Sequence, residues 1–566
     1  MCTTMIVGKN ATKDGSVIVA HSDDDIDDGR IIRVPSLNMS TRNVYYDNAS
    51  LGLNPLYNST EIRRYIGKDR GNGYDTLNEG YAPSVPLGNI PGHNSSTYAY
   101  FDSSYGIINE KGLMIGECTC GAKCTPEPDP NKRIFYSAEL SRVALERCTK
   151  AREAVELIGS LILKYGYYGT GETLLLGDAD EGWVMEMCAY EVDGTSGIWV
   201  AQRVPDDEFF VAANEFRIRD IYKNEKDQKQ LIQLECGYFN SLSETGEERS
   251  DLIYSSNLFA ACQKAGWIKE DEDSIDWLPT VSYGEYSHPY YSLRRVWRAF
   301  SKVAPLLNLP AKVEDGYTRA YPFSVKPEEK LSVLAIADIY RDSYEGTEFD
   351  QTIGIGAGPF RNPVRYEVNP DKGDSNNLSV FKPVGAWERT ISIYRCGTLW
   401  INQGMYVNNQ QEAISWIGLD RPATNCLMPI HSSVPELPSK LETMNLLEFE
   451  FNGDSAWWAF NFVANYVNLN YQYMIRDLKV LQQKLEREAE ETVQKLIDEK
   501  CMDKLTEFSS SHFEKVVNEW WKLATRLIVK YNDGCTTTGP TSIMNRIDYP
   551  KAWLSKAGYF DGPTQY

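Results

Sequence analysis

The second residue of the chain, Cys2, has the type and the position that nucleophilic chemistry requires. Removal of Met1 would give Cys2 a free α-amine beside its own thiol, so that a nucleophile and its base would share one residue. The thiolate is the reactive form of cysteine, and an α-amine with an unperturbed pKa of about 7.7–8.0 can take the thiol proton near neutrality. The alternative is that Cys2 is a small apolar start to a buried strand.

A run of carboxylates follows at Asp23-Asp-Asp25, with Asp27 and Asp28 close behind it. The run lacks the glycine and the terminal glutamate that a Ca²⁺ loop needs at fixed spacing. It is either solvated surface charge or the source of one carboxylate that the second strand of a hairpin places opposite Cys2. Such a carboxylate would hold an ammonium group, of the enzyme or of a substrate, and Asp24 is our candidate for it.

Thiolates at the spacing of Cys118, Cys120 and Cys124 can share one zinc ion, but a further pair of ligands is missing. The chain has five histidines and neither a His-Glu-x-x-His motif nor paired Cys-x-x-Cys motifs. It also has no P-loop, no Gly-x-Gly-x-x-Gly after a strand and no Gly-x-Ser-x-Gly elbow. We therefore expect reduced, buried cysteines, no metal and no cofactor.

The composition is that of a folded, acidic protein of 566 residues with a formal net charge of −21. This charge repels nucleic acid and anionic lipid, and no Lys/Arg-rich run opposes it, so we expect no nucleic-acid partner. No run of 18 apolar residues occurs, and the N-terminus has neither a basic region nor an apolar region of a signal peptide. We therefore expect no membrane association and a cytoplasmic location by default, or secretion if a longer precursor exists.

Two β-branched, apolar runs, Thr4–Val7 and Ser16–His21, flank a loop that contains Lys13-Asp-Gly15, which predicts a hairpin with an Asp-Gly turn. The hairpin would place Cys2 at the edge of a sheet. Residues 23–95 show little periodicity and are rich in turn-forming residues, so we expect long loops there that shape a site. Further antiparallel pairs are expected at Gly106–Gly112 with Leu113–Glu117 and at Thr173–Gly177 with Gly182–Met187.

Helical spacing of apolar residues runs from Ala138 to Tyr165, with a break near Cys148-Thr149. Strands and helices thus arrive in groups of hairpins followed by helices, which favours an α+β fold over a doubly wound parallel sheet. From Ser455 to about Lys500 the chain is nearly free of Gly and Pro and keeps a helical period. With a second helix over about His512 to Tyr531, it predicts a helical hairpin packed on the core.

Several segments, in order along nearly the whole chain, resemble the dipeptidase-A family of cysteine dipeptidases, which are N-terminal-nucleophile hydrolases. Each motif is weak alone, but their order and a cysteine at position two make a chance match improbable. The segments are Cys2-Thr-Thr, Val7-Gly-Lys, Asp14-Gly-Ser16, Ala20-His-Ser-Asp-Asp24, Ala213-Asn-Glu-Phe-Arg-Ile218, Ser292-Leu-Arg-Arg-Val-Trp-Arg298, Asp342-Ser-Tyr-Glu-Gly346 through Gly358-Pro-Phe360, and Ser455-Ala-Trp-Trp-Ala-Phe460.

The resemblance implies a four-layer αββα sandwich, with a catalytic core over residues 1–440 and a mainly helical extension over 441–566. It also implies hydrolysis of dipeptides of broad sequence through an acyl-enzyme on Cys2, without metal. The α-amine of Cys2 would take the thiol proton and hand it to the leaving amino acid, and water would then release the first residue.

The resemblance also suggests roles for other residues. The side-chain amide of Asn214 matches the position of an oxyanion donor, and the backbone N–H of Thr119 is a second candidate donor beside the substrate. Arg295 resembles a site arginine, although its neighbours Arg294 and Arg298 lie within a small misalignment. Asp24, together with an arginine, would recognise the charged ends of a dipeptide.

His21 departs from the pattern, because many relatives carry arginine at this position. A permanent cation would be replaced by a group that titrates near pH 6.5, and we expect His21 beside the substrate site to make activity sensitive to pH.

Two other hypotheses about the function stay open. One is an N-terminal-nucleophile amidase that acts on N-acyl amides or lactams, since specificity loops decide the substrate. The other is a non-catalytic interaction protein on the same fold. Neither the preferred side chains of a dipeptide nor the formation of a homo-oligomer can be read from the sequence.

Overall fold

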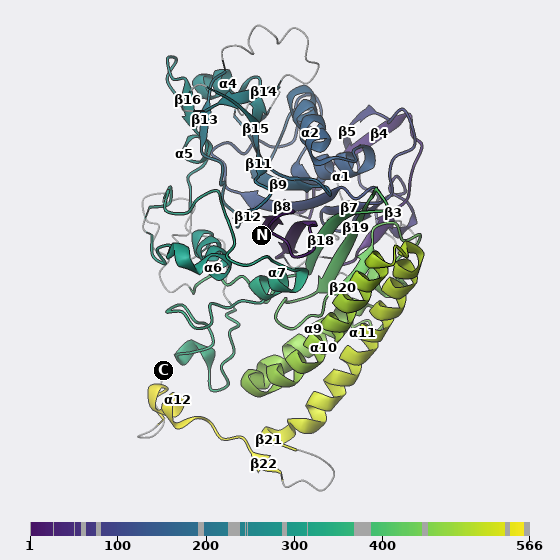
Figure 1. The fold of residues 1–566 in the computed structure, drawn as a ribbon, viewed down its shortest axis with the longest axis vertical. Helices are drawn as coiled ribbons and strands as arrows, with labels where there is room; N and C mark the ends of the chain where they lie inside the picture. Colours follow the sequence, from purple (N-terminus) through teal and green to yellow (C-terminus); the bar gives the residue numbers. More distant parts are fainter. Residues whose placement is uncertain are drawn as a thin grey trace.

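The computed structural model describes the chain except at residues 1, 26–27, 50, 58–63, 75–80, 191–196, 225–237, 244, 246, 286–290, 314, 367–386, 444–450, 538–543 and 560–566. Two antiparallel sheets lie face to face at its centre, and helices cover both outer faces (Figure 1). This is the four-layer α+β architecture expected from the sequence.

The first sheet has seven strands and carries Cys2 immediately before its third strand, β1. The hairpin prediction is confirmed, because β1 pairs antiparallel with β2 and Thr3 lies opposite Ser22. The expected edge position of Cys2 is wrong: β1 is an interior strand, paired with β12 on its other side. The strands, in spatial order, are β17 (Ser324–Val325), β12 (Phe209–Ala212), β1 (Thr3–Val7), β2 (Val17–Asp23), β18 (Thr398–Val407), β19 (Gln410–Leu419) and β20 (Met428–His431).

The second sheet has eleven strands and includes the antiparallel pairs predicted near residues 106–117 and 173–187. The region 23–95, predicted as loops, contributes one strand, β3, to this sheet and two further strands to a separate ribbon. In spatial order the sheet runs β16 (Ser274–Asp276), β13 (Asp220–Tyr222), β14 (Tyr238–Leu242), β15 (Glu248–Ser255), β11 (Gly197–Val204), β10 (Gly182–Ala189), β9 (Gly171–Gly177), β8 (Met114–Cys120), β7 (Gly106–Asn109), β6 (Tyr100–Asp102) and β3 (Ile32–Val34). Two small ribbons pair β4 (Thr41–Tyr45) with β5 (Pro86–Pro91) and β21 (Cys535–Thr536) with β22 (Asn545–Arg546).

The two sheets approach most closely where β8 crosses β1 and β2. Gly116 makes this approach feasible, because a Cβ atom built on it would lie 2.7 Å from Oγ1 of Thr4. Side chains along β1 point alternately to the two faces of the first sheet. Ile6 faces the second sheet, whereas Met5 and Val7 face the helices behind the first sheet. The end of β8 is thereby held against the start of β1.

Helices α1 (Ser137–Arg147) and α2 (Ala151–Tyr165) cover the eleven-stranded sheet and are separated near Cys148, as the sequence predicts. Helices α6 (Leu293–Val303) and α7 (Val333–Tyr340) cover the seven-stranded sheet. Shorter helices are α4 (Leu258–Lys264), α5 (Trp277–Val281), α8 (Ser439–Glu442) and α12 (Lys551–Lys556).

Near the C-terminus, α10 (Tyr471–Asp498) and α11 (Met502–Lys530) form the predicted helical hairpin, which runs along one flank of the molecule (Figure 1). The single helix predicted over residues 455–500 is instead divided into α9 (Ala456–Val467) and α10 by a 3₁₀ turn at Asn468–Asn470. The second helix begins ten residues before the predicted His512, because Leu505 and Ser509 already pack inward. Within the described residues no helix combines the length and the apolar character needed to cross a membrane.

Candidate active site

Cys2 lies at the meeting point of the two sheets, and its side chain is buried. Its Sγ donates a hydrogen bond to Oε2 of Glu117, in the middle of β8, over 3.2 Å. Its carbonyl oxygen accepts one from Nη1 of Arg295 over 2.8 Å. Burial, and next the negative charge of Glu117, raise the pKa of the Cys2 thiol well above its usual value. In this environment the thiol is protonated near neutrality and needs a base to become a nucleophile.

Glu117 belongs to a buried pair of carboxyl groups. Its neighbour Glu172, on β9, accepts a hydrogen bond from the hydroxyl of Tyr136 over 2.5 Å. Burial and the charge of Glu117 raise the pKa of Glu172 well above its usual value, so Glu172 keeps its proton near neutrality. Glu117 then carries the negative charge of the pair, and it also accepts the hydroxyl of Thr119 over 2.9 Å.

His21, on β2, turns one ring nitrogen toward the backbone of β8. Nδ1 accepts a hydrogen bond from the N–H of Glu117 over 2.9 Å, so the neutral ring must carry its proton on Nε2, which lies 3.9 Å from Oε2 of Glu117. The ring is buried and packs on Trp400, with 4.2 Å between ring centroids. Burial lowers the pKa of His21 to about 3. The expectation of titration near pH 6.5 is therefore wrong, because it assumed a solvated imidazole.

A direct test follows for His21. We expect the ring-proton NMR signals of His21 to stay at their neutral positions from pH 5 to 8, since the pKa is lowered to about 3. The signals are assigned by their absence in His21→Gln, and a free imidazole peptide in the same buffer provides the titrating control. A titration step for His21 within this range would show that the ring is reached by water.

The thiol of Cys2, a ring nitrogen of His21 and a carboxylate oxygen of Glu117 lie within 4.8 Å of one another, which is close enough for three ligands of one metal ion. The hydrogen bonding opposes this use. The Nδ1 lone pair of His21 is occupied by a backbone N–H, and Nε2 carries the ring proton. The histidine therefore offers no lone pair to a cation unless it first loses its contact with β8.

Arg295, on α6, ties the nucleophile strand to the strand beside it. Nη1 donates to the carbonyl of Cys2 and to Oγ1 of Thr3, over 2.8 and 2.9 Å. Nη2 donates to the carbonyl of Ala213 and to Oδ1 of Asn214, over 3.2 and 2.8 Å. The guanidinium is fully buried, so these bonds fix the end of β1 relative to the end of β12.

The neighbouring arginines of the same helix point elsewhere. Arg294 pairs with Glu388, and Arg298 forms a two-bond ion pair with Asp342 over 2.8 and 2.7 Å. Of the three arginines considered from the sequence, Arg295 alone makes a hydrogen bond to Cys2 in the described part of the chain.

Asn214 follows β12 with a φ of 63°, a left-handed conformation that asparagine tolerates better than most residues. Its Nδ2 donates to the carbonyl of Thr119 over 2.8 Å. The amide therefore spans the ends of β12 and β8, and Arg295 links it to the carbonyl of Cys2. Thr119 itself is partly exposed, in contrast to the buried Glu117, so this end of β8 faces the outside of the site.

Asp24 is fully buried just beyond β2. Its Oδ2 accepts hydrogen bonds from the hydroxyl of Ser22 over 3.1 Å and from Nη2 of Arg389 over 2.7 Å. Ser22 in turn accepts the backbone N–H of Thr3 over 3.2 Å. Asp24 is thus linked to β1 through one hydroxyl, and it already has a cationic partner that the sequence did not indicate.

The cysteine cluster singled out from the sequence lies beside the site. Sγ of Cys118 lies 2.6 Å from the backbone nitrogen of Asn214, and Sγ of Cys120 donates to the carbonyl of Cys118 over 3.3 Å. With Cys124, these thiols are unbridged and buried. Among the described residues they do not come together as ligands of one metal ion.

Comparisons with known proteins place the chain in a family. The model of peptidase family C69 matches residues 1–59 and 102–484. The chain therefore belongs to peptidase family C69, a family of hydrolases.

Relatives of known name are distant. A probable dipeptidase of Latilactobacillus sakei is 25% identical over 374 residues, which are 65% of this chain and 65% of that protein. The chain thus spans just under two thirds of that relative. A probable dipeptidase B of Lactococcus lactis is 23% identical over 84% of this chain and 82% of its own. Among solved structures, penicillin V acylase from Agrobacterium tumefaciens matches 36% of this chain and 49% of its own, with 15% identity and a TM-score of 0.19.

Proposed function

We propose that this chain is a cysteine dipeptidase that hydrolyses dipeptides of broad sequence through an acyl-enzyme on Cys2. The observation that carries the proposal is a buried cysteine immediately before β1, whose carbonyl accepts a hydrogen bond from Arg295, which also donates to the side-chain amide of Asn214. Membership of family C69 and relatives named as dipeptidases support the choice of substrate.

In the proposed reaction, loss of Met1 frees the α-amine of Cys2, which takes the thiol proton. The thiolate attacks the peptide carbonyl, the C–N bond breaks, and the α-ammonium returns the proton to the leaving amino acid. Water then attacks the thioester while the α-amine takes a proton from it. The C–S bond breaks, the sulfur takes the proton back from the α-ammonium, and the first amino acid leaves as its carboxylate after its acid proton passes to solvent.

We assign stabilisation of the oxyanion, which forms on the peptide carbonyl oxygen when the thiolate attacks, to the side-chain amide of Asn214 and the backbone N–H of Thr119. The amide of Asn214 carries two hydrogens, and its bond to Thr119 uses one of them. Each such donor contributes about 3–4 kcal/mol to stabilisation of the transition state. Arg295 contacts the carbonyl of Cys2 and not its sulfur, which supports a positioning role. We keep Asp24 and His21 as the groups nearest to the ammonium end of the substrate.

The test combines intact-protein mass spectrometry with amino-acid release from a dipeptide mixture. We expect loss of Met1 and release that EDTA leaves unchanged. Cys2→Ala should lower the rate by at least about a thousandfold, as removal of a nucleophile does elsewhere. Cys501→Ala, at a half-buried cysteine between α10 and α11, is the matched control and should leave the rate unchanged.

Equal release by purified wild type and Cys2→Ala would refute the proposal. If the processed protein released no amino acids from dipeptides but hydrolysed N-acyl amides in a Cys2-dependent way, the nucleophile would stand and the substrate class would change.

A further inference from the structure

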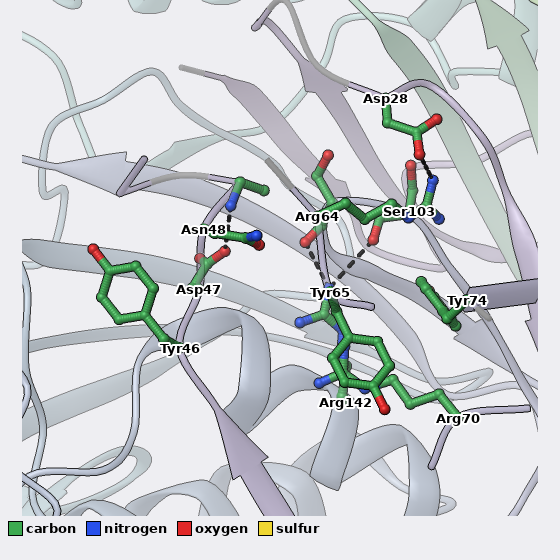
Figure 2. Close-up of a pocket in the computed structure, with 12 residues that line it drawn as sticks. Asp28, Tyr46, Asp47, Asn48, Arg64, Tyr65, Arg70, Tyr74, Ser103 and Arg142 are labelled. Atoms are coloured by element: carbon green, nitrogen blue, oxygen red, sulfur yellow. Dashed lines mark hydrogen bonds and ion pairs between the residues drawn. The ribbon is translucent and has the colours of Figure 1, made fainter. Parts of the chain in front are cut away.

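A small polar cavity lies on the helix-covered side of the eleven-stranded sheet, against the turn between β6 and β7. Its volume is about 20 Å³, and it opens to solvent on one side. Its walls include the rings of Tyr46, Tyr65 and Tyr74 and the guanidinium groups of Arg64 and Arg142 (Figure 2).

Arg64 is the unusual member of this cavity. Its side chain is 7% exposed, and Nη1 pairs with a carboxylate oxygen of Asp28 (Figure 2). Nε and Nη2 are buried and find no hydrogen-bond acceptor in the described part of the chain. These two N–H groups point along the same edge of a guanidinium, and that edge binds both oxygens of a carboxylate at once. A buried donor without an acceptor is costly, so a matching ligand would stabilise the pocket.

The other two arginines of the wall, Arg70 and Arg142, already have partners, and Arg70 pairs with Glu139. Arg142 donates to Asp102, to Glu139 and to the carbonyls of Ser103 and Ser104. The contrast identifies Arg64 as the side chain of this cavity with unused binding capacity.

The charges around Arg64 favour an anion with a single charge. Arg30 and Arg64 both pair with Asp28, and all three groups are buried, which leaves one positive charge in excess. Asp28 and Asp47 also line the cavity, so a doubly charged phosphate would meet more repulsion than a carboxylate.

The cavity adjoins the candidate active site through Tyr105. This residue directly follows Ser104 of the cavity wall, and its ring centroid lies 5.9 Å from that of His21. Burial raises the pKa of the Tyr105 hydroxyl, and the charges of Glu117 in the candidate active site and of Asp47 in the cavity wall raise it further. Tyr105 therefore has residues of the candidate active site on one side and the cavity on the other.

We propose that the Nε and Nη2 edge of Arg64 binds a carboxylate group in this cavity. The carboxylate belongs either to the dipeptide itself or to a separate small carboxylate that binds beside the active site. Assignment of the carboxylate to the dipeptide rests on the proposed dipeptidase function. Binding of a carboxylate to Arg64 does not depend on that function.

Thermal melting in sodium acetate tests the binding itself. At constant ionic strength, acetate should raise the melting temperature of the wild type relative to chloride and to acetamide, because a ligand of the native state stabilises it. Arg64→Gln should lose this shift. Arg30→Gln removes the other partner of Asp28 and one positive charge but leaves the Arg64 edge intact, so it should keep a reduced shift. Arg64→Lys retains the charge beside Asp28 without the two-donor edge, so it should fold and still lose the shift.

The proposal is overturned if acetate has no effect on the wild type, or if the shift is the same in Arg64→Lys. Initial rates then identify the source. If the substrate supplies the carboxylate, Arg64→Lys should raise KM at least about tenfold for dipeptide acids, and not for the matching dipeptide amides. If a separate carboxylate is the ligand, both KM values should stay unchanged while the acetate shift is lost. The melting experiment decides the binding proposal even if the protein hydrolyses no dipeptide.

Discussion

Arg295→Met is expected to lower kcat/KM for dipeptides by about a hundred- to a thousandfold, the size of loss that a displacement of about 1 Å at a reacting group causes. The guanidinium joins Cys2 and Thr3 at the start of β1 to Ala213 and Asn214 at the end of β12. Without it, both the thiol and the proposed oxyanion donor lose their fixed separation. Steady-state kinetics on the processed protein measure the effect.

The same substitution should also reduce the free energy of unfolding. Five buried acceptors lose a donor, the carbonyl of Tyr291 among them. Each unpaired group costs about 1–3 kcal/mol, so we expect a loss of at least about 3 kcal/mol in urea unfolding. Arg295→Lys separates the two effects, because lysine keeps the charge and some of the bonds. It should recover most of the stability and only a small part of kcat.

Arg298→Lys is the matched control for Arg295. It lies one turn further along α6 and pairs with Asp342, away from Cys2. Its kcat/KM should stay within about threefold of the wild type. A kcat/KM for Arg295→Met within a factor of ten of the wild type would show that the clamp does not position the nucleophile.

Local features of the fold were predictable because they depend on local patterns. Alternating apolar residues and an Asp-Gly turn predict the β1–β2 hairpin, and helical spacing predicts α1, α2 and the α10–α11 pair. The interior position of β1 was not predictable in this way. Its partner β12 lies some 200 residues further along the chain, and no short-range periodicity encodes which distant strands pair.

The candidate site likewise contains residues that sequence motifs predicted and residues that they did not. Asn214 and Arg295 were reached through motifs, and the structure places both within hydrogen-bond reach of the start of β1 or the end of β8. Arg389, the partner of Asp24, lies in no motif that the sequence suggested. A role for Glu117 could have been predicted from the sequence, because it directly follows the apolar run Leu113–Gly116. A charged residue in such a strand must be paired when the strand is buried.

The pKa of His21 could not be predicted, because it depends on complete burial and on a backbone donor from another sheet. A histidine met in a sequence has only its solution pKa as a reference. The error therefore concerned the environment of the residue and not its identity.

Glu117→Gln is expected to increase the rate at which iodoacetamide alkylates Cys2 near pH 7. The carboxylate lies 3.2 Å from the sulfur, and its negative charge is among the causes that raise the pKa of the thiol. Removing a like charge at this distance should lower the thiol pKa by about 1–3 units. Below the thiol pKa the thiolate fraction rises tenfold for each unit by which that pKa falls, so alkylation should be about ten- to a thousandfold faster. Mass spectrometry of the N-terminal peptide isolates Cys2 from the other cysteines.

Glu172→Gln is the matched control. Glu172 lies in the same buried pair, but its raised pKa keeps it neutral, so glutamine imitates the form already present. Its alkylation rate should stay within about threefold of the wild type. The two variants make the same exchange of a carboxyl oxygen for an amide nitrogen on adjacent strands and differ in whether a charge is lost. If both accelerate alkylation equally, the effect is loosened packing. If Glu117→Gln has the pH profile of the wild type, Glu117 does not carry the charge of the pair, and the basis for its control of the thiol is removed.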